Sequence, residues 1–136
     1  KMGKSEDNGI YLVDDPKVIR KKVMRAVTDA GPAHPGAEMT EPVRNLFYLL
    51  ELLSTPDTVE YFREQYDRAT IRYGDLKKQI AEDMIAFTTP FREKILAIYN
   101  DEEYLRKVVK MGREKARASA SKTLEDVRRI IGYKPF

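Results

Sequence analysis

The first residues that could carry chemistry are the five that open the sequence: Lys1, Met2, Gly3, Lys4 and Ser5. Two lysines three positions apart, beside a glycine and a serine, form a cationic loop that can bind phosphate groups. The segment also matches the end of a P-loop, but that motif needs an earlier glycine and a helix that begins at once, and Asn8-Gly9 follows here. The segment therefore predicts phosphate binding, and the alternative is a basic terminus without a function.

A second group of basic side chains lies near the end of the sequence. Between Tyr104 and Lys122 there are seven Lys/Arg residues and one acid, Glu114. Four of the basic residues are spaced so that they share one face of a helix: Arg106, Lys110, Arg113 and Arg117. Small and apolar residues form the adjoining stripe: Leu105, Val109, Gly112, Ala116 and Ala120. This combination suits docking on an RNA backbone, although a solvated helix face is the usual explanation of a charge run.

Other kinds of active site are excluded or disfavoured by the residue types. The sequence has no cysteine, which rules out disulfides, iron–sulfur clusters, Cys-ligated zinc and thiol catalysis. The single histidine, His34, lies among prolines and glycines and is expected to be an ordinary loop residue, and no metal site is predicted. The carboxylate groups Asp14-Asp15, Glu82-Asp83 and Asp101-Glu102-Glu103 are interpreted as helix caps and first turns rather than acid–base pairs.

Aromatic side chains are a further group that could contact nucleic acid, by stacking on unpaired bases. Most of them have core spacing, so packing is the preferred interpretation. Tyr61 and Tyr73 lie off these stripes and are the better candidates for stacking. Thr28-Asp29 is expected to end the first helix and to have a structural role.

The elements that must position these groups are predicted to be helices. Asp15-Pro16 and Thr55-Pro56 are helix-start signals, because aspartate or threonine can cap a first turn into which proline fits. Residues 28–41 are predicted to be a loop, and the helix 42–53 is expected to be buried on several sides. The inward stripes are Ile19, Val23, Ala26 and Val27 in the first helix, Val59, Phe62, Tyr66 and Ala69 in the third, and Leu76, Ile80, Met84, Phe87, Phe91, Ile95 and Ile98 in the fourth.

Local signals set the remaining boundaries. Residues 73–75 are expected to form a turn, and Pro90 is expected to kink or split the fourth helix. A fifth helix opens at residues 100–101, a last apolar segment covers 124–131, and the only strand candidate is 10–13. The predicted fold class is all-α, a helical bundle of about five to six helices with a flexible N-terminal loop.

Length and charge limit the possible partners. The 136 residues, of which 42% are hydrophobic and 35% charged, suit one domain with a solvated surface. Residues 1–27 carry a net charge of +3, residues 28–100 carry −4 and residues 101–136 carry +4, so the two basic ends hint at a polyanionic partner. No apolar run approaches the ~18 residues of a membrane-spanning helix, and no targeting peptide is recognised. No membrane partner is expected, and a cytoplasmic location is predicted.

The opening residues resemble the KMSKS signature of class I aminoacyl-tRNA synthetases, except that Gly3 stands where serine is usual. Positions that resemble the tryptophan-specific family of these enzymes follow: Asn8, Ile10, Leu12, Asp15, Ile19, Lys21, Lys22, Ala26, Thr28 and Asp29. Others look like the helical C-terminal region of that family: Glu82, Phe87, Pro90, Arg92 and the run 112–118. The resemblance covers nearly the whole chain. Because the sequence begins at Lys1 rather than at a methionine, we expect a fragment of a longer protein.

The resemblance implies part of a ligase that activates tryptophan with ATP and transfers it to its tRNA. It implies that Lys1 and Lys4 are catalytic and that the whole loop Lys1–Ser5, including Met2 and Gly3, binds the ATP phosphates. Lys4 would stabilise the charge that develops on the departing pyrophosphate. Mg²⁺ would accompany ATP, and the full-length enzyme would be a homodimer. The helical region is implied to face the tRNA anticodon, so the predicted tRNA contacts are Arg106, Lys110, Arg113 and Arg117.

The predicted organisation is a signature loop and linker over residues 1–13 and a C-terminal helical, anticodon-facing domain over residues 14–136. The sequence contains no HIGH motif and no nucleotide-binding sheet, so the fragment alone is predicted to bind no cofactor and to be inactive. The alternative is an independent basic helical module that binds RNA or protein, in which Lys1–Ser5 is a chance match. A plain scaffolding bundle is a third interpretation.

Overall fold

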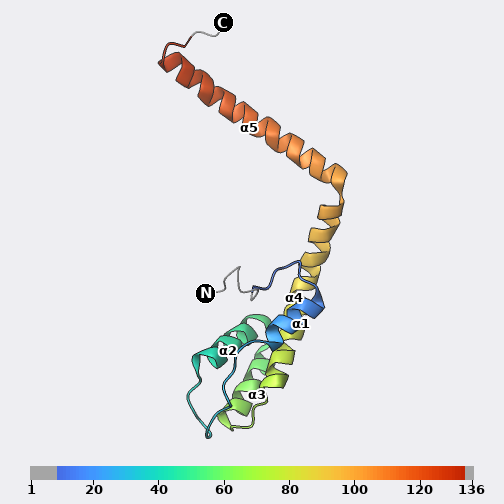
Figure 1. Cartoon of the computed structure of the whole chain (residues 1–136), viewed down its shortest axis with the longest axis vertical. Helices are drawn as coiled ribbons and strands as arrows, with labels where there is room; N and C mark the ends of the chain where they lie inside the picture. The colour runs from blue at the N-terminus through green and yellow to red at the C-terminus, as the bar shows by residue number, and fades with distance from the viewer. Residues whose placement is uncertain (1–8, 134–136) are drawn as a thin grey trace. The chain divides into compact units, whose positions relative to one another are not determined.

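Residues 9–133 are described by a computed structural model, and they form five α-helices. The helices are α1 (Pro16–Met24), α2 (Glu41–Leu53), α3 (Pro56–Asp67), α4 (Tyr73–Asn100) and α5 (Glu102–Ile130), labelled in Figure 1. No strand occurs within this described range, which confirms the all-α fold class. The chain divides into two units, residues 1–94 and 95–136. Across residues 9–133, no helix is both long and apolar enough to cross a membrane.

The helix starts follow the side-chain caps that the sequence predicts. Asp15 Oδ1 accepts a hydrogen bond from the amide of Lys17 at 2.9 Å, and Pro16 occupies the first position of α1. Asp101 caps α5 in the same way, through the amide of Tyr104 at 2.8 Å. Thr55 Oγ1 accepts from the amide of Thr58 at the start of α3. These caps satisfy first-turn amides that have no partner inside the helix.

Two other local predictions were wrong, and a third was wrong in part. The strand candidate 10–13 contains a turn, in which the amide of Asp14 donates to the carbonyl of Tyr11 at 3.0 Å. Residues 73–75 form the first turn of α4, where Asp75 suits the positive end of the helix. Pro90 does not split α4, which continues to Asn100, and the alternative of a kink at this residue stays a prediction.

One hydrophobic core joins α1, α2, α3 and the first half of α4, which Figure 1 shows as neighbouring ribbons. Its residues recur at helical spacing: Ile19 and Val23 on α1, Val43, Leu46, Phe47 and Leu50 on α2, Phe62 and Tyr66 on α3, and Leu76, Ile80, Ala81 and Met84 on α4. Phe47 and Tyr66 meet edge to face, with ring centres 6.0 Å apart. The Tyr66 hydroxyl donates to the carbonyl of Glu38 at 3.2 Å, which satisfies its only buried polar atom.

The predicted stripes extend beyond the residues that are buried. In α2, Tyr48 and Leu52 are exposed, so this helix is buried on one broad face rather than on several sides. In α4, Phe87 and Phe91 are exposed, although they continue the buried stripe. Val27 is also exposed, because α1 ends at Met24 before the stripe reaches it. Spacing identified the apolar face of each helix but not the length over which another element covers it.

The interpretation of Glu82-Asp83 as a cap or first turn was also wrong. Both residues lie in the middle of α4. Glu82 Oε1 accepts from the Arg20 guanidinium at 2.6 Å, which links α4 to α1. Asp83 accepts from the Ser54 hydroxyl and from the Gln79 amide. These carboxylates therefore connect elements of the first unit.

Helix α5 belongs to the second unit and continues through residues 124–130, so the last apolar segment predicted at 124–131 is not a separate element. It ends in a Schellman motif: the amide of Tyr133 donates to the carbonyl of Arg128 at 2.9 Å, and the amide of Gly132 donates to the carbonyl of Arg129 at 3.3 Å. Gly132 has a φ of +70°, which glycine adopts without strain. No side chain of α5 is buried.

Candidate nucleic-acid interface

The basic stripe, defined as Arg106, Lys110, Arg113 and Arg117, lies on α5 and is exposed. An α-helix turns by about 100° per residue, so the four positions fall within an arc of about 60°. The rise of about 1.5 Å per residue spreads them over about 16 Å of the helix axis. The structure therefore brings the four predicted contacts onto one face, in a line that can follow several phosphate groups.

The stripe has one ion pair in the described range, between Arg106 and Glu102 at 2.6 Å. Both side chains are largely exposed, so this pair stabilises the helix only weakly and can open. Lys110, Arg113 and Arg117 have no ion pair within residues 9–133. A partner can therefore bind these three charges without first breaking an ion pair within residues 9–133.

A shallow groove of about 420 Å³ runs along this part of α5. The residues that line it are Glu102, Leu105, Arg106, Val109, Lys110 and Arg113. Three of the six carry a positive charge, and Leu105 and Val109 come from the small and apolar stripe beside them. The two predicted stripes are thus adjacent on one surface of the helix.

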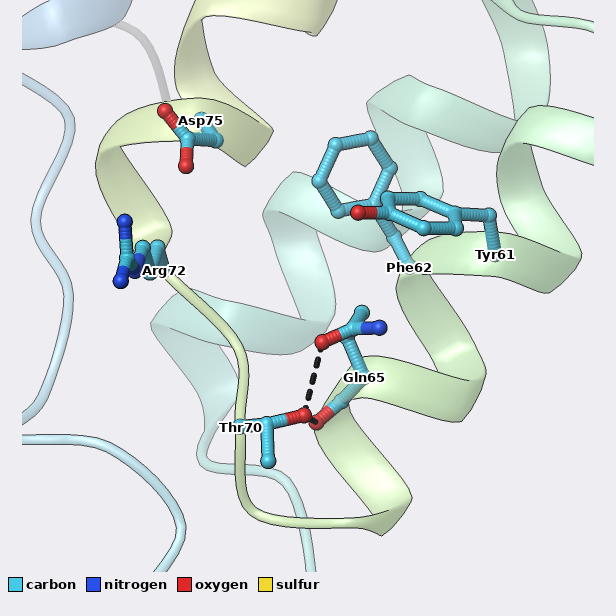
Figure 2. Close-up of a pocket in the computed structure, with 6 residues that line it drawn as sticks. All are labelled: Tyr61, Phe62, Gln65, Thr70, Arg72 and Asp75. Atoms are coloured by element: carbon cyan, nitrogen blue, oxygen red, sulfur yellow. Dashed lines mark hydrogen bonds between the residues drawn. The ribbon is translucent and has the colours of Figure 1, made fainter.

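The two tyrosines proposed for stacking have different surroundings. Tyr61 on α3 is 57% exposed and rests edge to face on Phe62, with ring centres 5.1 Å apart. In Figure 2 both rings lie at one end of a cavity of about 380 Å³, with Gln65 and Thr70 below them and Arg72 across from them. The Thr70 hydroxyl donates to Gln65 Oε1 at 2.7 Å. Because more than half of Tyr61 is exposed, it stays a stacking candidate.

Tyr73, in contrast, is held by the carboxylate of Asp29. Its hydroxyl donates to Asp29 Oδ1 at 2.7 Å, and the ring is partly buried against the core. Asp29 Oδ1 also accepts from the amide of Gly31 at 2.8 Å, and Oδ2 accepts from the Thr40 hydroxyl at 2.5 Å. Asp29 thereby ties both ends of the 28–41 loop to the start of α4.

The surroundings of Asp29 and Tyr73 shift the pKa values of these two side chains in opposite directions. The hydrogen bonds from Thr40 and Tyr73 lower the pKa of the Asp29 carboxyl, because they stabilise its ionised form. Burial, with the hydrogen bond to the Asp29 carboxylate, raises the pKa of the Tyr73 hydroxyl. Asp29 is thus a structural anion, in line with the structural role predicted for it, although α1 ends at Met24, before it.

The network around Asp29 was not predicted from the sequence, although one signal was present. Asp29 precedes Gly31 by two positions, a spacing typical of an aspartate that accepts from the backbone of a turn. The contact with Tyr73 spans 44 positions and had no such signal. The predicted phosphate-binding residues, Lys1, Met2, Gly3, Lys4 and Ser5, lie outside the described residues.

Comparison with known proteins places the chain in a family. Residues 1–89 match the family described as tRNA synthetases class I (W and Y), W and Y being tryptophan and tyrosine. The chain belongs to this family. The match ends at the exposed half of α4, so the basic stripe lies outside it.

Relatives within the family extend the similarity over the remaining residues. The chain is 56% identical, over 98% of its length, to "Tryptophan--tRNA ligase" of Porphyromonas gingivalis. It is 40% identical, over 99% of its length, to "Tryptophan--tRNA ligase 1" of Streptomyces coelicolor. The chain spans about two fifths of the length of these relatives, 41% and 40% respectively.

A solved structure shows the same fold. The tryptophanyl-tRNA synthetase from Campylobacter jejuni aligns with 97% of this chain and with 42% of its own, with a TM-score of 0.78 and 23% sequence identity. A second structure of the same enzyme, described as complexed with ADP and tryptophan, gives a TM-score of 0.77 at 24% identity. At these identities, the likeness supports the fold alone.

Proposed function

We propose that this chain is the C-terminal part of a tryptophan–tRNA ligase, which activates tryptophan with ATP and transfers it to its tRNA. The observation that carries the proposal is the 56% identity, over 98% of the chain, to a tryptophan–tRNA ligase. Within this enzyme, residues 1–13 are the signature loop and linker, and residues 14–136 are the helical domain that faces the anticodon. The whole enzyme works as a homodimer.

The first part of the proposal concerns ATP. Lys1 and Lys4 bind its phosphates, Lys4 stabilises the pyrophosphate as it leaves, and Ser5 adds a hydrogen bond. Mg²⁺ comes bound to the phosphates of ATP as their counter-ion. The support for these roles is the match to the family over residues 1–89, which includes the five loop residues.

The test is ATP–pyrophosphate exchange by the full-length protein that carries this sequence. We expect exchange that depends on tryptophan and not on tyrosine, the other amino acid in the family description. Lys4→Ala lowers kcat by about 100-fold, the usual cost of removing one group that stabilises a developing negative charge. Lys21→Ala, on the exposed side of α1, leaves kcat unchanged and is the control. Absence of tryptophan-dependent exchange in the unsubstituted protein would refute the proposal.

The second part concerns tRNA. The basic stripe of α5 contacts the phosphate backbone near the anticodon, because its four charges share one exposed face. Each cation that pairs with a phosphate displaces bound counter-ions, so the affinity falls steeply as salt rises. Which base the domain reads is a separate question from this backbone contact.

The stripe is tested with the anticodon stem-loop of tryptophan tRNA and with the same stem carrying a scrambled loop, each at several salt concentrations. Arg113→Ala weakens binding to both and lowers the slope of log K against log salt by about 1. Lys115→Ala is the matched control, because position 115 lies on the opposite side of α5 from Arg106. Equal effects of the two substitutions would refute a contact specific to the stripe.

The same titration addresses the independent basic module, which remains the alternative. Such a module binds RNA without loop preference and belongs to a protein without tryptophan-dependent exchange. A preference for the cognate loop, together with exchange by the full-length protein, is the outcome that the ligase predicts.

A further inference from the structure

The cavity beside Tyr61 combines an aromatic surface with polar side chains. It measures about 380 Å³ and is lined by residues of α3, of the turn that follows and of the start of α4: Tyr61, Phe62, Gln65, Thr70, Arg72 and Asp75. All six residues belong to the first unit. The cavity is therefore formed within one folded unit, and its groups can be compared with the chemistry of a ligand.

One wall of this cavity is aromatic. Tyr61 is 57% exposed, whereas its neighbour Phe62 is buried. The two rings meet edge to face at an angle of 78°, so the buried ring supports the exposed one. In Figure 2 the Tyr61 hydroxyl points towards the side on which Arg72 and Asp75 lie. An exposed ring supported in this way is a surface on which an unpaired base can stack.

Two hydrogen-bond donors of the cavity have no partner among residues 9–133. The Thr70 hydroxyl donates to Gln65 Oε1 at 2.7 Å, and the N–H groups of Gln65 Nε2 remain unpaired in that range. The exposed Arg72 guanidinium likewise makes no hydrogen bond or ion pair there. The nearby Arg68, in contrast, is paired with Glu64 at 3.0 Å. A ligand that offers acceptors can therefore bind in the cavity without first displacing a partner of these donors.

The turn between α3 and α4 sets the polar side of the cavity. The amide of Ala69 donates to the carbonyl of Tyr66, and the amide of Thr70 donates to the carbonyl of Gln65, both at 2.9 Å. Ala69 has a φ of +55°, a left-handed conformation that is uncommon for a residue with a Cβ. Backbone of this kind persists only where the surrounding contacts impose it. These contacts place Thr70 beside Gln65 and bring Arg72 across from the rings, as Figure 2 shows.

The groups of the cavity match a nucleotide better than a simpler ligand. An inorganic anion would use Arg72 and leave the aromatic wall uncovered, and an apolar side chain would cover the donors without bonding to them. A nucleotide has a ring to stack, a polar edge and a charged phosphate. Its edge can accept from Gln65 and donate to Asp75, whose exposed pair with Lys78 at 3.7 Å is weak. Its phosphate can pair with Arg72.

We propose that this cavity binds one unpaired nucleotide of an RNA strand, with the base on Tyr61, the base edge at Gln65 and the phosphate at Arg72. The inference rests on the proposed function, which supplies a tRNA as the partner, and it adds a contact in the first unit to the one proposed for α5. Tyr61 and Arg72 are both exposed, so the strand can continue on either side of the bound nucleotide.

The test measures binding of the full-length protein to the anticodon stem-loop of tryptophan tRNA. Tyr61→Leu removes the ring, and we expect it to weaken binding by about tenfold, the usual effect of losing one stacked base. Tyr61→Phe keeps the ring and binds as the unsubstituted protein does. Tyr48→Leu is the matched control, because Tyr48 on α2 is 61% exposed and does not line this cavity. Equal affinities of Tyr61→Leu and Tyr48→Leu would overturn the proposal.

Stem-loops with a single abasic position identify the bound nucleotide. At the position that occupies the cavity, loss of the base weakens binding to the unsubstituted protein and to Tyr48→Leu by about tenfold. The same loss has no further effect on Tyr61→Leu, because both changes remove one contact. Fully additive effects at every loop position would overturn the contact between the base and Tyr61.

The phosphate contact is tested by the dependence of binding on salt. We expect Arg72→Gln to lower the slope of log K against log salt by about 1. Arg68→Gln is the control, because its guanidinium is already paired with Glu64, and it leaves the slope unchanged. Equal slopes for the two variants would overturn the role of Arg72.

Free adenosine and cytidine monophosphates distinguish the source of the nucleotide. We expect them to compete with the stem-loop only at millimolar concentrations, because a single nucleotide lacks the remaining contacts of the strand. Competition at micromolar concentrations that Tyr61→Leu abolishes would overturn the RNA strand as the ligand. The two proposals can also fail separately. Absence of tryptophan-dependent exchange refutes the proposed function, whereas normal exchange with equal binding by Tyr61→Leu and Tyr48→Leu overturns only the nucleotide site.

Discussion

At the scale of single residues, Asp29 connects the loop 28–41 with the start of α4. Its carboxylate accepts hydrogen bonds from the Gly31 amide and from the hydroxyls of Thr40 and Tyr73. The first two fix the loop 28–41, which has no helix of its own, and the third attaches that loop to α4. Because all three donors bond more strongly to the ionised carboxylate than to the neutral acid, the stability of this connection depends on pH.

We predict that Asp29→Asn lowers the melting temperature at pH 7 by roughly 5 °C. The carboxyl has a lowered pKa in the folded chain, so its contribution is complete above the unfolded value of about 3.9 and is lost as pH falls through the folded value. The difference between the two proteins is therefore constant above about pH 5 and shrinks below about pH 4. Thermal melts from pH 3 to pH 7 measure it.

The control is Asp67→Asn, which removes an exposed carboxylate that makes no side-chain hydrogen bond within residues 9–133. We expect little change in its melting temperature across the same range. A difference between Asp29→Asn and the unsubstituted chain that grew as the pH fell would contradict the assignment of Asp29 as a structural anion.

At the scale of the element, α5 is stable for reasons that lie within its own sequence. It has a capped start at Asp101, acidic residues in its first turn and basic residues in its last, and a Schellman motif after Ile130. None of its side chains is buried. Its stability therefore depends on helix propensity and on the signals at its two ends. Substitution of its glycines tests both contributions.

Two glycine substitutions are predicted to have opposite effects on α5. Gly112→Ala stabilises the helix by up to about 1 kcal/mol, because position 112 is inside the helix and an added Cβ meets no atom within 4 Å. Gly132→Ala destabilises it, because position 132 has a φ of +70° that alanine adopts only with strain. Helical circular dichroism of the two variants against temperature measures both effects, and a shift of the same sign in both would contradict this account.

At the scale of the whole chain, the buried hydrophobic residues within the described range 9–133 all lie between Ile19 and Met84. Beyond Met84, α4 keeps its apolar periodicity but leaves Phe87 and Phe91 exposed. The two phenylalanines contact each other, with ring centres 5.3 Å apart. This exposed pair buries much less apolar surface than the core does. The free energy of folding is therefore concentrated in α1, α2, α3 and the first half of α4.

Two phenylalanine substitutions test this distribution in the 136-residue chain. Phe47, which is 2% exposed, fills the centre of the core, whereas Phe91 is 44% exposed. We predict that Phe47→Ala costs about 3–5 kcal/mol in the free energy of unfolding. Phe91→Ala costs less than about 1 kcal/mol, because most of its area is already in water. Urea unfolding of both variants measures the difference, and similar costs would contradict this core.

The sequence by itself determined the features that rest on local chemistry. The caps at Asp15, Thr55 and Asp101 and the shared face of the basic stripe follow from interactions within one or two helical turns. The loop 28–41 likewise follows from prolines and glycines that cannot continue a helix. The phosphate-binding role of Lys1–Ser5 remains a prediction from resemblance.

Only the tertiary structure decided which of the predicted surfaces are covered and which distant side chains meet. Leu76 and Phe91 lie on the same stripe of α4, but only Leu76 has other helices around it. Periodicity marks an apolar face, and burial also needs a second surface, whose position no local pattern contains. The contact between Asp29 and Tyr73 had no sequence signal for the same reason, because chain folding creates the proximity.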